Sequence, residues 1–214
     1  MHVITDNLGF LLQGVLVTLE LTVLGYVGAL VLGTLMAVFR VGPIPPLRVL
    51  GTVYVEFFRN IPLLSLLVLV IFGLPDAGVT IGLFASGAIC LALSASAFVC
   101  EAMRGGINSV SVGQAEAARA IGLSFTQVLR FVILPQAFRT MVQPLVNVFI
   151  GVLLSSALAA AVGVPELTNR TEQLNLQYAE AVVCFVFAGV VYLAVALAAG
   201  AVGGRLEHRM AIRR

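Results

Sequence analysis

Five long apolar runs that contain no charged residue dominate this chain and limit the folds that are open to it. A helix needs about 20 apolar residues to cross a hydrocarbon core of about 30 Å. Only 10% of the 214 residues are charged, against about a quarter in ordinary soluble domains. The sequence therefore predicts an all-α, polytopic membrane protein with five transmembrane helices. The charge-free runs cover residues 21–39, 60–75, 77–100, 140–165 and 181–204.

The whole chain, residues 1–214, is expected to form a single transmembrane domain. The short second run gains its missing turns from GTVYVEFF at 51–58, and Pro62 within it predicts a kink or a local break, because proline lacks a backbone N–H. Gly105-Gly106 is expected to end the third helix. The predicted spans are about 8–39, 51–73, 78–103, 138–161 and 178–204.

The placement of the arginines predicts the orientation in the membrane. All 12 basic residues are arginine, and cytoplasmic loops carry an excess of positive charge. With the N-terminus outside, only Arg170 lies outside and the other eleven of the 12 lie inside. We therefore expect a multi-pass protein with its N-terminus outside and its C-terminus in the cytoplasm.

The chain lacks the residues that several kinds of chemistry require. It contains no lysine, so it cannot form a standard Walker A nucleotide site or a lysine Schiff base. Cys90, Cys100 and Cys184 lie in apolar segments, where a thiol usually acts as a small hydrophobe. No catalytic residue, metal site, bound cofactor or nucleic-acid partner is expected, and any ATP and magnesium must be bound by another chain.

A polar segment, GQAEAARAIGLSFTQVLRFVILPQAFR, interrupts the apolar pattern at residues 113–139. Its first part is rich in strong helix formers and is broken at Gly122. Ser124 and Gln127 form a capping-box pattern that starts a second helix, which Pro135 is expected to close. The segment therefore predicts a helix-glycine-helix loop at about 108–136.

Two interpretations of this loop are open from the residues alone. It is either an interfacial helix on the lipid headgroups, anchored by arginines, or a compact knob that engages a protein partner. In the second case small and charged side chains would make the contacts. The anchors would be Arg119, Arg130 and Arg139, and the contact residues Glu116, Ala117, Ala118 and Arg119.

Polar side chains inside the spans are the candidates for a solute pathway. Such groups are costly in lipid and usually face a cavity or another helix. For each of them a hydrogen bond between packed helices is an equally good interpretation. The candidates are Glu20, Asn60, Ser94, Ser96, Gln143, Asn147, Ser155 and Ser156.

The loop resembles the EAA loop of ABC importer permeases, E-A-A-x₃-G-x₉-I-x-L-P. The matching residues are Glu116-Ala117-Ala118, Gly122 and Val132-Ile133-Leu134-Pro135, with Val132 in place of isoleucine. In that family the loop forms a coupling helix that docks in a groove of the ATP-hydrolysing subunit. The resemblance thus implies that ATPase coupling uses Gln114, Glu116, Ala117, Ala118, Arg119, Gly122, Leu134 and Pro135.

Other motifs are similar to those of polar amino acid permeases, especially the glutamate type. They are YVEFFRNIPLL at 54–64, FVCEAMRGGINSV at 98–110 and LPQAFR at 134–139. The resemblance implies the transmembrane domain of a type I ABC importer in a bacterial plasma membrane, forming half of an alternating-access pathway for glutamate or another polar amino acid. Its implied partners are a cytoplasmic ABC ATPase dimer, a sister permease, an extracytoplasmic solute-binding protein and membrane lipid. A permease for glutamine, a basic amino acid or an opine, and a scaffold or channel outside the ABC family, remain alternatives.

One segment departs from the family pattern. Leu154, Ser155, Ser156 and Ala157 stand where the family usually has a lysine, then Asp or Asn, then Thr and Ser or Thr. The missing lysine favours a heterodimer with a sister permease over a homodimer. Without that lysine the segment predicts an amino acid as the substrate but does not select glutamate.

Overall fold

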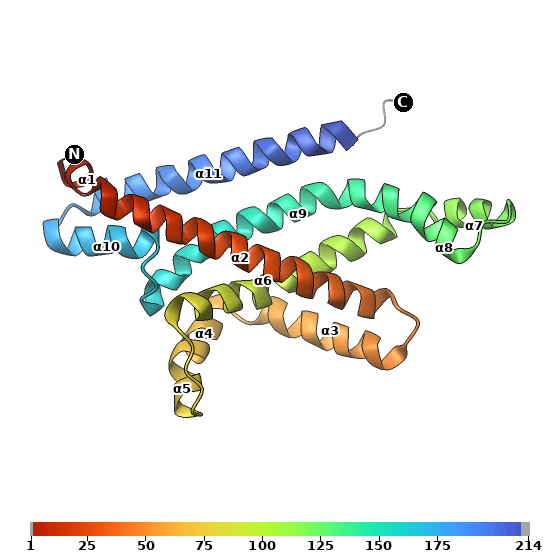
Figure 1. The fold of residues 1–214 in the computed structure, drawn as a ribbon, viewed down its shortest axis with the longest axis horizontal. Helices are drawn as coiled ribbons and strands as arrows, with labels where there is room; N and C mark the ends of the chain where they lie inside the picture. Colours follow the sequence, from red (N-terminus) through yellow and green to blue (C-terminus); the bar gives the residue numbers. More distant parts are fainter. Residues whose placement is uncertain (1, 211–214) are drawn as a thin grey trace.

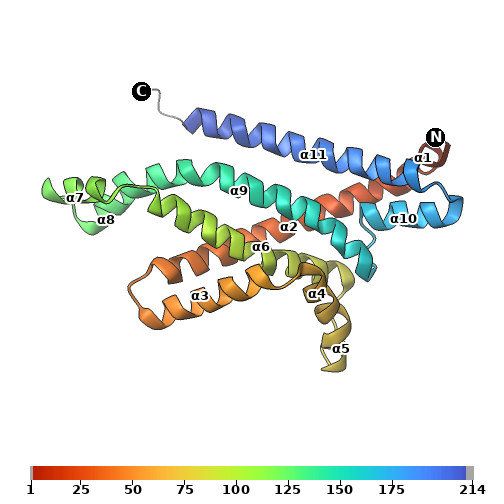
Figure 2. The same ribbon diagram turned by 180° about the vertical axis from the view of Figure 1, so that it is seen from behind.

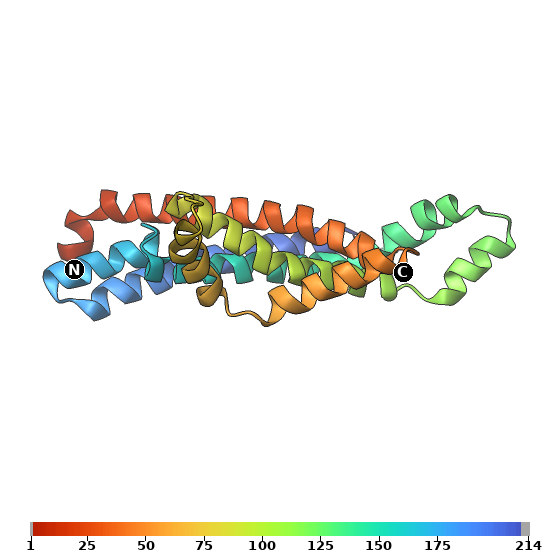
Figure 3. The same ribbon diagram turned by 90° about the horizontal axis from the view of Figure 1, so that it is seen from below.

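The computed structural model describes residues 2–210, and its regular elements there are all helices (Figure 1). Four long helices lie along one axis and form the body of the molecule, with α3 (Pro45–Asn60) alongside (Figures 1 and 3). The four are α2 (Leu8–Val41), α6 (Leu83–Asn108), α9 (Leu134–Ser156) and α11 (Ala181–Met210). The short helices α7 (Val112–Ala120) and α8 (Phe125–Gln127) project at one end, here called the loop end (Figure 1). The helices α1 (His2–Asp6) and α10 (Leu167–Tyr178) lie at the other, the α10 end.

The predicted multi-pass membrane architecture is confirmed. Four unbroken helical segments are long and apolar enough to cross a membrane, and a bent helix pair can supply the fifth span. The four segments are Leu8–Val41, Leu83–Asn108, Phe125–Val162 and Ala181–Arg209.

The expected break at Pro62 is present and divides the second span. The helices Pro45–Asn60 and Leu63–Asp76 meet at 100°. Ile61 takes an extended conformation, φ −80° and ψ 129°, as expected for a residue before proline. The second helix of this pair, Leu63–Asp76, projects sideways from the bundle (Figures 1 and 2). It comprises α4 (Leu63–Val68), the π-helical η1 (Leu69–Gly73) and α5 (Leu74–Asp76).

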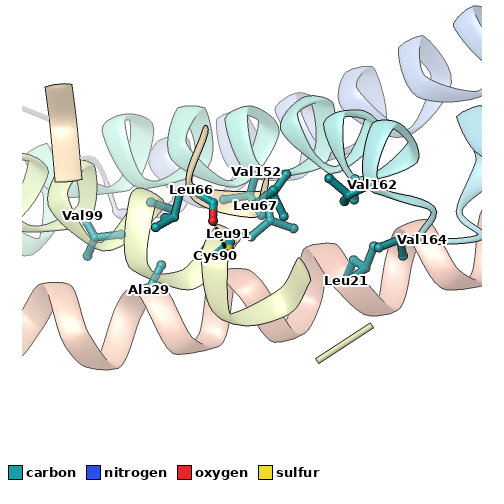
Figure 4. Close-up of a cluster of buried hydrophobic side chains, with 12 residues drawn as sticks. Leu21, Ala29, Leu66, Leu67, Cys90, Leu91, Val99, Val152, Val162 and Val164 are labelled. Atoms are coloured by element: carbon teal, nitrogen blue, oxygen red, sulfur yellow. Dashed lines mark hydrogen bonds between the residues drawn. The ribbon is translucent and has the colours of Figure 1, made fainter. Parts of the chain in front are cut away.

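The main core lies where α2, α4, α6, α9 and the 3₁₀ segment η3 (Ala157–Val162) meet (Figure 4). Small side chains on α6 let these helices approach closely, as membrane helix packing requires. Cys90 is fully buried there, and the thiols of Cys100 and Cys184 are also buried and free. The cysteines therefore act as core residues, as predicted.

The prediction that Gly105-Gly106 ends the third helix is wrong, because α6 continues to Asn108. Gly106 faces α9, where a Cβ atom would collide with Met141 and lie 3.0 Å from the carbonyl oxygen of Ala137. The glycine is needed here for close helix packing rather than for termination.

The prediction that Pro135 closes the second loop helix is also wrong. The chain passes from α8 (Phe125–Gln127) through the π-helical η2 (Val128–Ile133) into α9 without a break. Pro135 stands in the first turn of α9, and a π-helical turn before it changes the hydrogen-bond pattern that its missing N–H disturbs.

The α10 end contains two short helices that the sequence did not predict, α1 (His2–Asp6) and α10 (Leu167–Tyr178). Glu166 is fully buried, and its Oε1 accepts a hydrogen bond from the N–H of Asn169 at 2.8 Å, capping α10. Its Oε2 accepts hydrogen bonds from Tyr192 Oη at 2.6 Å and Thr18 Oγ1 at 3.3 Å. Burial raises the pKa of the Glu166 carboxyl above its ordinary 4.5, although these hydrogen bonds oppose the shift. The carboxylate therefore joins α2, α10 and α11.

Arg170 adds a second connection between α10 and α2. Its Nη1 donates to the carbonyl of Phe10 and to Gln13 Oε1, each at 2.9 Å, and its guanidinium lies 4.5 Å from the ring centre of Phe10. The α10 end is thus held by a set of hydrogen bonds between residues far apart in sequence.

Candidate functional site

The loop at the loop end has the helix-glycine-helix geometry that the sequence predicts. α7 (Val112–Ala120) ends in a Schellman motif, in which Gly122 has a φ of +91°. The N–H of Gly122 donates to the carbonyl of Arg119 at 3.0 Å, and that of Leu123 to the carbonyl of Ala118 at 3.2 Å. Because a positive φ is costly for any residue with a Cβ, this corner requires glycine.

The second loop helix begins with the predicted capping box. The N–H of Ser124 donates to Gln127 Oε1 at 2.8 Å, and the N–H of Gln127 donates to Ser124 Oγ at 3.4 Å. Two of the free N–H groups at this helix start are thereby satisfied, so the corner has a defined shape.

Side-chain hydrogen bonds fasten the loop to the transmembrane helices. Gln136 of α9 donates to Gln114 Oε1 of α7 at 2.7 Å and to the carbonyl of Val132 at 2.9 Å. At the base of the loop the hydroxyls of Ser109 and Thr140 lie 3.0 Å apart. A force on α7 would therefore reach α9 directly.

Most of the predicted coupling residues lie on the surface of the loop. Ala118 is buried against the second loop helix and Leu134 is half-buried, whereas the others are exposed. The exposed residues of the set are Gln114, Glu116, Ala117, Arg119, Gly122 and Pro135.

Two apolar side chains at the glycine corner were not among the residues predicted from the sequence. Ile121 is 79% exposed and Phe125 is 78% exposed, although Phe125 fits an apolar helical stripe in the sequence. Exposed apolar side chains surrounded by polar ones are typical of protein-interaction surfaces. Their positions on both sides of Gly122 were the available signal.

A groove of about 370 Å³ between α4, α6 and α9 contains three of the eight pathway candidates, Ser94, Asn147 and Ser155. The other lining residues are apolar, and no charged side chain lines the groove. They are Leu63, Leu91, Ala95, Phe98, Val148, Gly151 and Val152. The groove thus offers hydroxyl and amide groups on an apolar wall.

Two candidate serines instead make hydrogen bonds within the helix packing. Ser96 is fully buried, and its hydroxyl lies 2.8 Å from Tyr54 Oη and donates to the carbonyl of Leu93 at 2.6 Å. Ser156 is fully buried and donates to the carbonyl of Leu153 at 2.7 Å.

The remaining three candidates do not line the groove. Asn60 donates to the carbonyl of Glu56 at 2.6 Å at the end of α3. Gln143 is exposed on α9, one turn before Asn147, and Glu20 is exposed on α2.

A shared ion pair ties α2 to α6 near the loop end. Glu101 Oε1 contacts the guanidinium of Arg40 and lies 3.2 Å from Arg104 Nη1. The Arg40 side chain is only 10% exposed. Sequence spacing reveals the Arg104 partner but not Arg40, which lies 61 residues away from Glu101.

Comparisons with known proteins agree with this geometry. Residues 29–212 match the family described as the binding-protein-dependent transport system inner membrane component, and the chain belongs to this family. The expected membership of the ABC importer permeases is therefore confirmed.

Two curated relatives and one solved structure resemble the chain over nearly its full length. The probable glutamine ABC transporter permease protein GlnM of Bacillus subtilis is 36% identical over 208 residues, 97% of this chain and 96% of the relative. The glutamate transport system permease protein GluC of Corynebacterium efficiens is 34% identical over 217 residues, 95% of each chain. The crystal structure of an amino acid ABC transporter with histidines superposes with a TM-score of 0.91 at 30% identity, covering 96% of each chain.

Proposed function

We propose that the chain is one of two permease subunits of an ATP-driven importer of a polar amino acid. The observation that carries this proposal is the continuous helical path Phe125–Val162, which joins the loop to the groove. The glycine corner lies just before one end of this path, and Asn147 and Ser155 lie towards the other. One continuous helical element therefore connects the exposed loop surface with the groove that contains Ser94, Asn147 and Ser155, here called the polar groove.

The proposed mechanism is alternating access driven from the loop. An ABC ATPase dimer would receive Ile121, Phe125 and the exposed face of α7 in its grooves. Closure of the ATPases on ATP would move the loop, and α9 would transmit that movement to the groove. The loop would then lie in the cytoplasm, with the α10 end facing an extracytoplasmic binding protein, in agreement with the arginine distribution.

The position of the loop supports docking over the interfacial alternative. α7 and α8 project beyond the ends of α2, α3 and α11 along the long axis of the bundle (Figures 1 and 3). An interfacial helix would instead lie across the ends of the spans, in the plane of the membrane.

The lining of the groove favours an amino acid with a neutral polar side chain, glutamine above all. Ser94, Asn147 and Ser155 can donate and accept hydrogen bonds but carry no charge to balance a glutamate side chain. Glutamate would require a cation from a sister permease, which the missing lysine near Leu154 also suggests. Any amino acid also carries an α-carboxylate and an α-ammonium group, which no charged residue of this groove balances. We therefore propose a heterodimer in which the sister chain supplies these charged contacts.

The loop mechanism is tested by replacing Gly122 with valine in the assembled transporter. At a φ of +91° a β-branched residue costs roughly 1–2 kcal/mol, so uptake should fall by about 5- to 30-fold. Membrane insertion and subunit assembly should be unchanged. The matched control is Gly113→Val in the same loop, because Gly113 has no positive φ and a Cβ there meets no atom within 4 Å. Uptake at the wild-type rate in Gly122→Val would disprove the coupling role.

The substrate is tested separately by uptake of labelled glutamine, glutamate and arginine into vesicles that contain the complete complex. Labelled glutamine should be taken up faster than labelled glutamate or labelled arginine. Preferred uptake of glutamate or arginine would refute the neutral-substrate proposal while leaving the coupling mechanism intact.

A further inference from the structure

A second groove, of about 410 Å³, lies between α2, α9 and α11 and shares no lining residue with the polar groove. Its wall is apolar except for Tyr26, whose hydroxyl donates to the carbonyl of Leu145 at 3.1 Å. The wall therefore suits a hydrocarbon chain. The lining residues are Tyr26, Val146, Phe149, Val195, Ala198, Ala199, Val202, Gly203 and Leu206.

Next to the groove, α9 and α11 pack closely at one small residue, Gly203. A Cβ on Gly203 would lie 2.6 Å from the side chain of Val146, so the two helices meet closely there. The small side chains of Ala198 and Ala199, about one turn before Gly203 on α11, leave the space of the groove next to this contact. α9 and α11 run antiparallel (Figures 1 and 2) and pack against each other.

Helical spacing places two arginines at the loop end of this groove. Val202, Leu206 and Arg209 share one face of α11, because they are separated by four and three residues. On α9, Arg139 lies seven residues before Val146 and therefore on the same face.

The two arginines lie at similar depth. Arg139 and Arg209 are each about 10 Å along their helices from the Gly203–Val146 contact, and because the helices are antiparallel both lie towards the loop end. Neither makes an ion pair or a side-chain hydrogen bond with another residue in the part of the chain that the structure describes.

We propose that this groove binds an anionic phospholipid, with one acyl chain on the apolar wall and the phosphate between Arg139 and Arg209. Basic groups at the mouth of a groove between transmembrane helices match the headgroup charge, and the apolar wall matches the chain. The inference does not depend on the transported amino acid.

The charge contribution is tested with the purified transporter complex after removal of lipid. Native mass spectrometry would follow titration with phosphatidylglycerol and with phosphatidylcholine of identical acyl chains. Each arginine near an anionic lipid contributes about fivefold in affinity, so Arg139→Gln/Arg209→Gln should weaken phosphatidylglycerol binding by roughly 30-fold. Binding of phosphatidylcholine should stay equal in wild type and variant.

The control is Arg48→Gln/Arg59→Gln, which removes an equal charge from α3 on the far side of α2 and α6 (Figure 1). Arg48 is exposed, and its guanidinium donates to the carbonyl of Gly42 at 3.1 Å. This variant should bind phosphatidylglycerol as the wild type does. Equal affinity of the wild type and the double arginine variant would overturn the proposal.

A larger side chain in the groove tests, independently of charge, whether the acyl chain of the lipid occupies it. Ala199→Leu should weaken phosphatidylglycerol binding while both arginines remain, and millimolar inorganic phosphate should not displace the lipid. Displacement by inorganic phosphate would assign the arginines to a free anion instead. Disulfide cross-linking of Ala199→Cys to the sister permease in native membranes would assign the groove to a subunit interface, and either result would overturn the lipid site.

Discussion

The two ends of the bundle are held together in different ways. At the α10 end, the buried carboxylate of Glu166 bonds to Thr18, 148 residues away, and to Tyr192, 26 residues away. At the loop end, most of the bonds are local, such as the Ser124–Gln127 capping box, and exposed apolar side chains surround the corner. The α10 end fixes three helices, whereas the loop end presents an exposed surface, which the proposed coupling mechanism would move as a unit. Damage at the α10 end should therefore reduce folding stability, and damage at the loop end should reduce transport.

The largest expected effect is that of Glu166→Ala. It removes the cap of α10 and takes this acceptor from the hydroxyls of buried Thr18 and half-buried Tyr192. The free energy of unfolding should fall by about 2–4 kcal/mol, measured by denaturation of the purified protein in detergent. Glu172→Ala, an exposed carboxylate on the same helix, is the control and should leave stability unchanged. A wild-type stability for Glu166→Ala would remove the contrast between the ends.

Arg40→Gln tests whether the loop end contains a stabilising contact of its own. The change leaves Glu101 with only the more exposed Arg104. Because Glu101 is about a third exposed, the expected loss of stability is about 1–3 kcal/mol, less than for a fully buried pair. Arg59→Gln, an exposed arginine with no described ion pair, is the control. A loss of stability larger than that of Glu166→Ala would mean that the loop end, not the α10 end, contributes more to folding stability.

The pH dependence of stability provides a finer test of the Glu166 contact. The pKa of this carboxyl is raised in the folded protein, so the folded state holds the proton more tightly than the unfolded state does. This contribution is complete below the ordinary pKa of 4.5 and is lost as the pH rises through the folded pKa. Glu166→Gln cannot titrate, so the wild type should lose stability relative to it as the pH rises. Parallel melting temperatures for the two proteins from pH 4 to pH 8 would contradict this assignment.

The smallest effect on stability is expected for Gln136→Ala at the loop end. This change removes the hydrogen bond to Gln114 that fastens α7 to α9. A hydrogen bond of this kind contributes about 0.5–1.5 kcal/mol to stability, so the change in unfolding should be the smallest of the three stability variants. Because the bond also holds α7 against α9, uptake should fall by roughly 2- to 10-fold. Gln173→Ala is matched to it, because Gln173 donates to Asn169 Oδ1 at 2.8 Å on exposed α10. Equal uptake by the two variants would show that the α7–α9 bond plays no part in coupling.

The features that could be predicted from sequence are those with local causes. Ser124 and Gln127 lie three residues apart, and Gly122 interrupts a run of helix formers, so the loop follows from neighbouring residues. The break at Pro62 has an equally local cause. The two wrong predictions concern Gly106 and Pro135, where packing against Met141 and a π-helical turn override the usual terminating effect of these residue types.

The features that could not be predicted depend on distant partners or on helix rotation. α10 is fixed through Thr18 and Tyr192, which nothing in the local pattern links to Glu166. Ser94 lines the polar groove while Ser96, two positions on, faces Tyr54, since two residues turn a helix by about 200°. Composition identifies such serines as candidates, but only their rotational position assigns them a role.

The π-helical segment η2 also sets how far the residues that follow it are rotated about the helix axis relative to the glycine corner. It lies between the capped corner at Ser124 and the groove residues Asn147 and Ser155, all on one continuous helical path. A π-type turn holds about one residue more than an α-type turn, and one residue corresponds to about 100° of rotation. Conversion of η2 to regular α-helix would therefore turn Asn147 and Ser155 about a quarter of a revolution relative to the corner. The orientation of the groove lining relative to the glycine corner is thus set by a single turn of backbone.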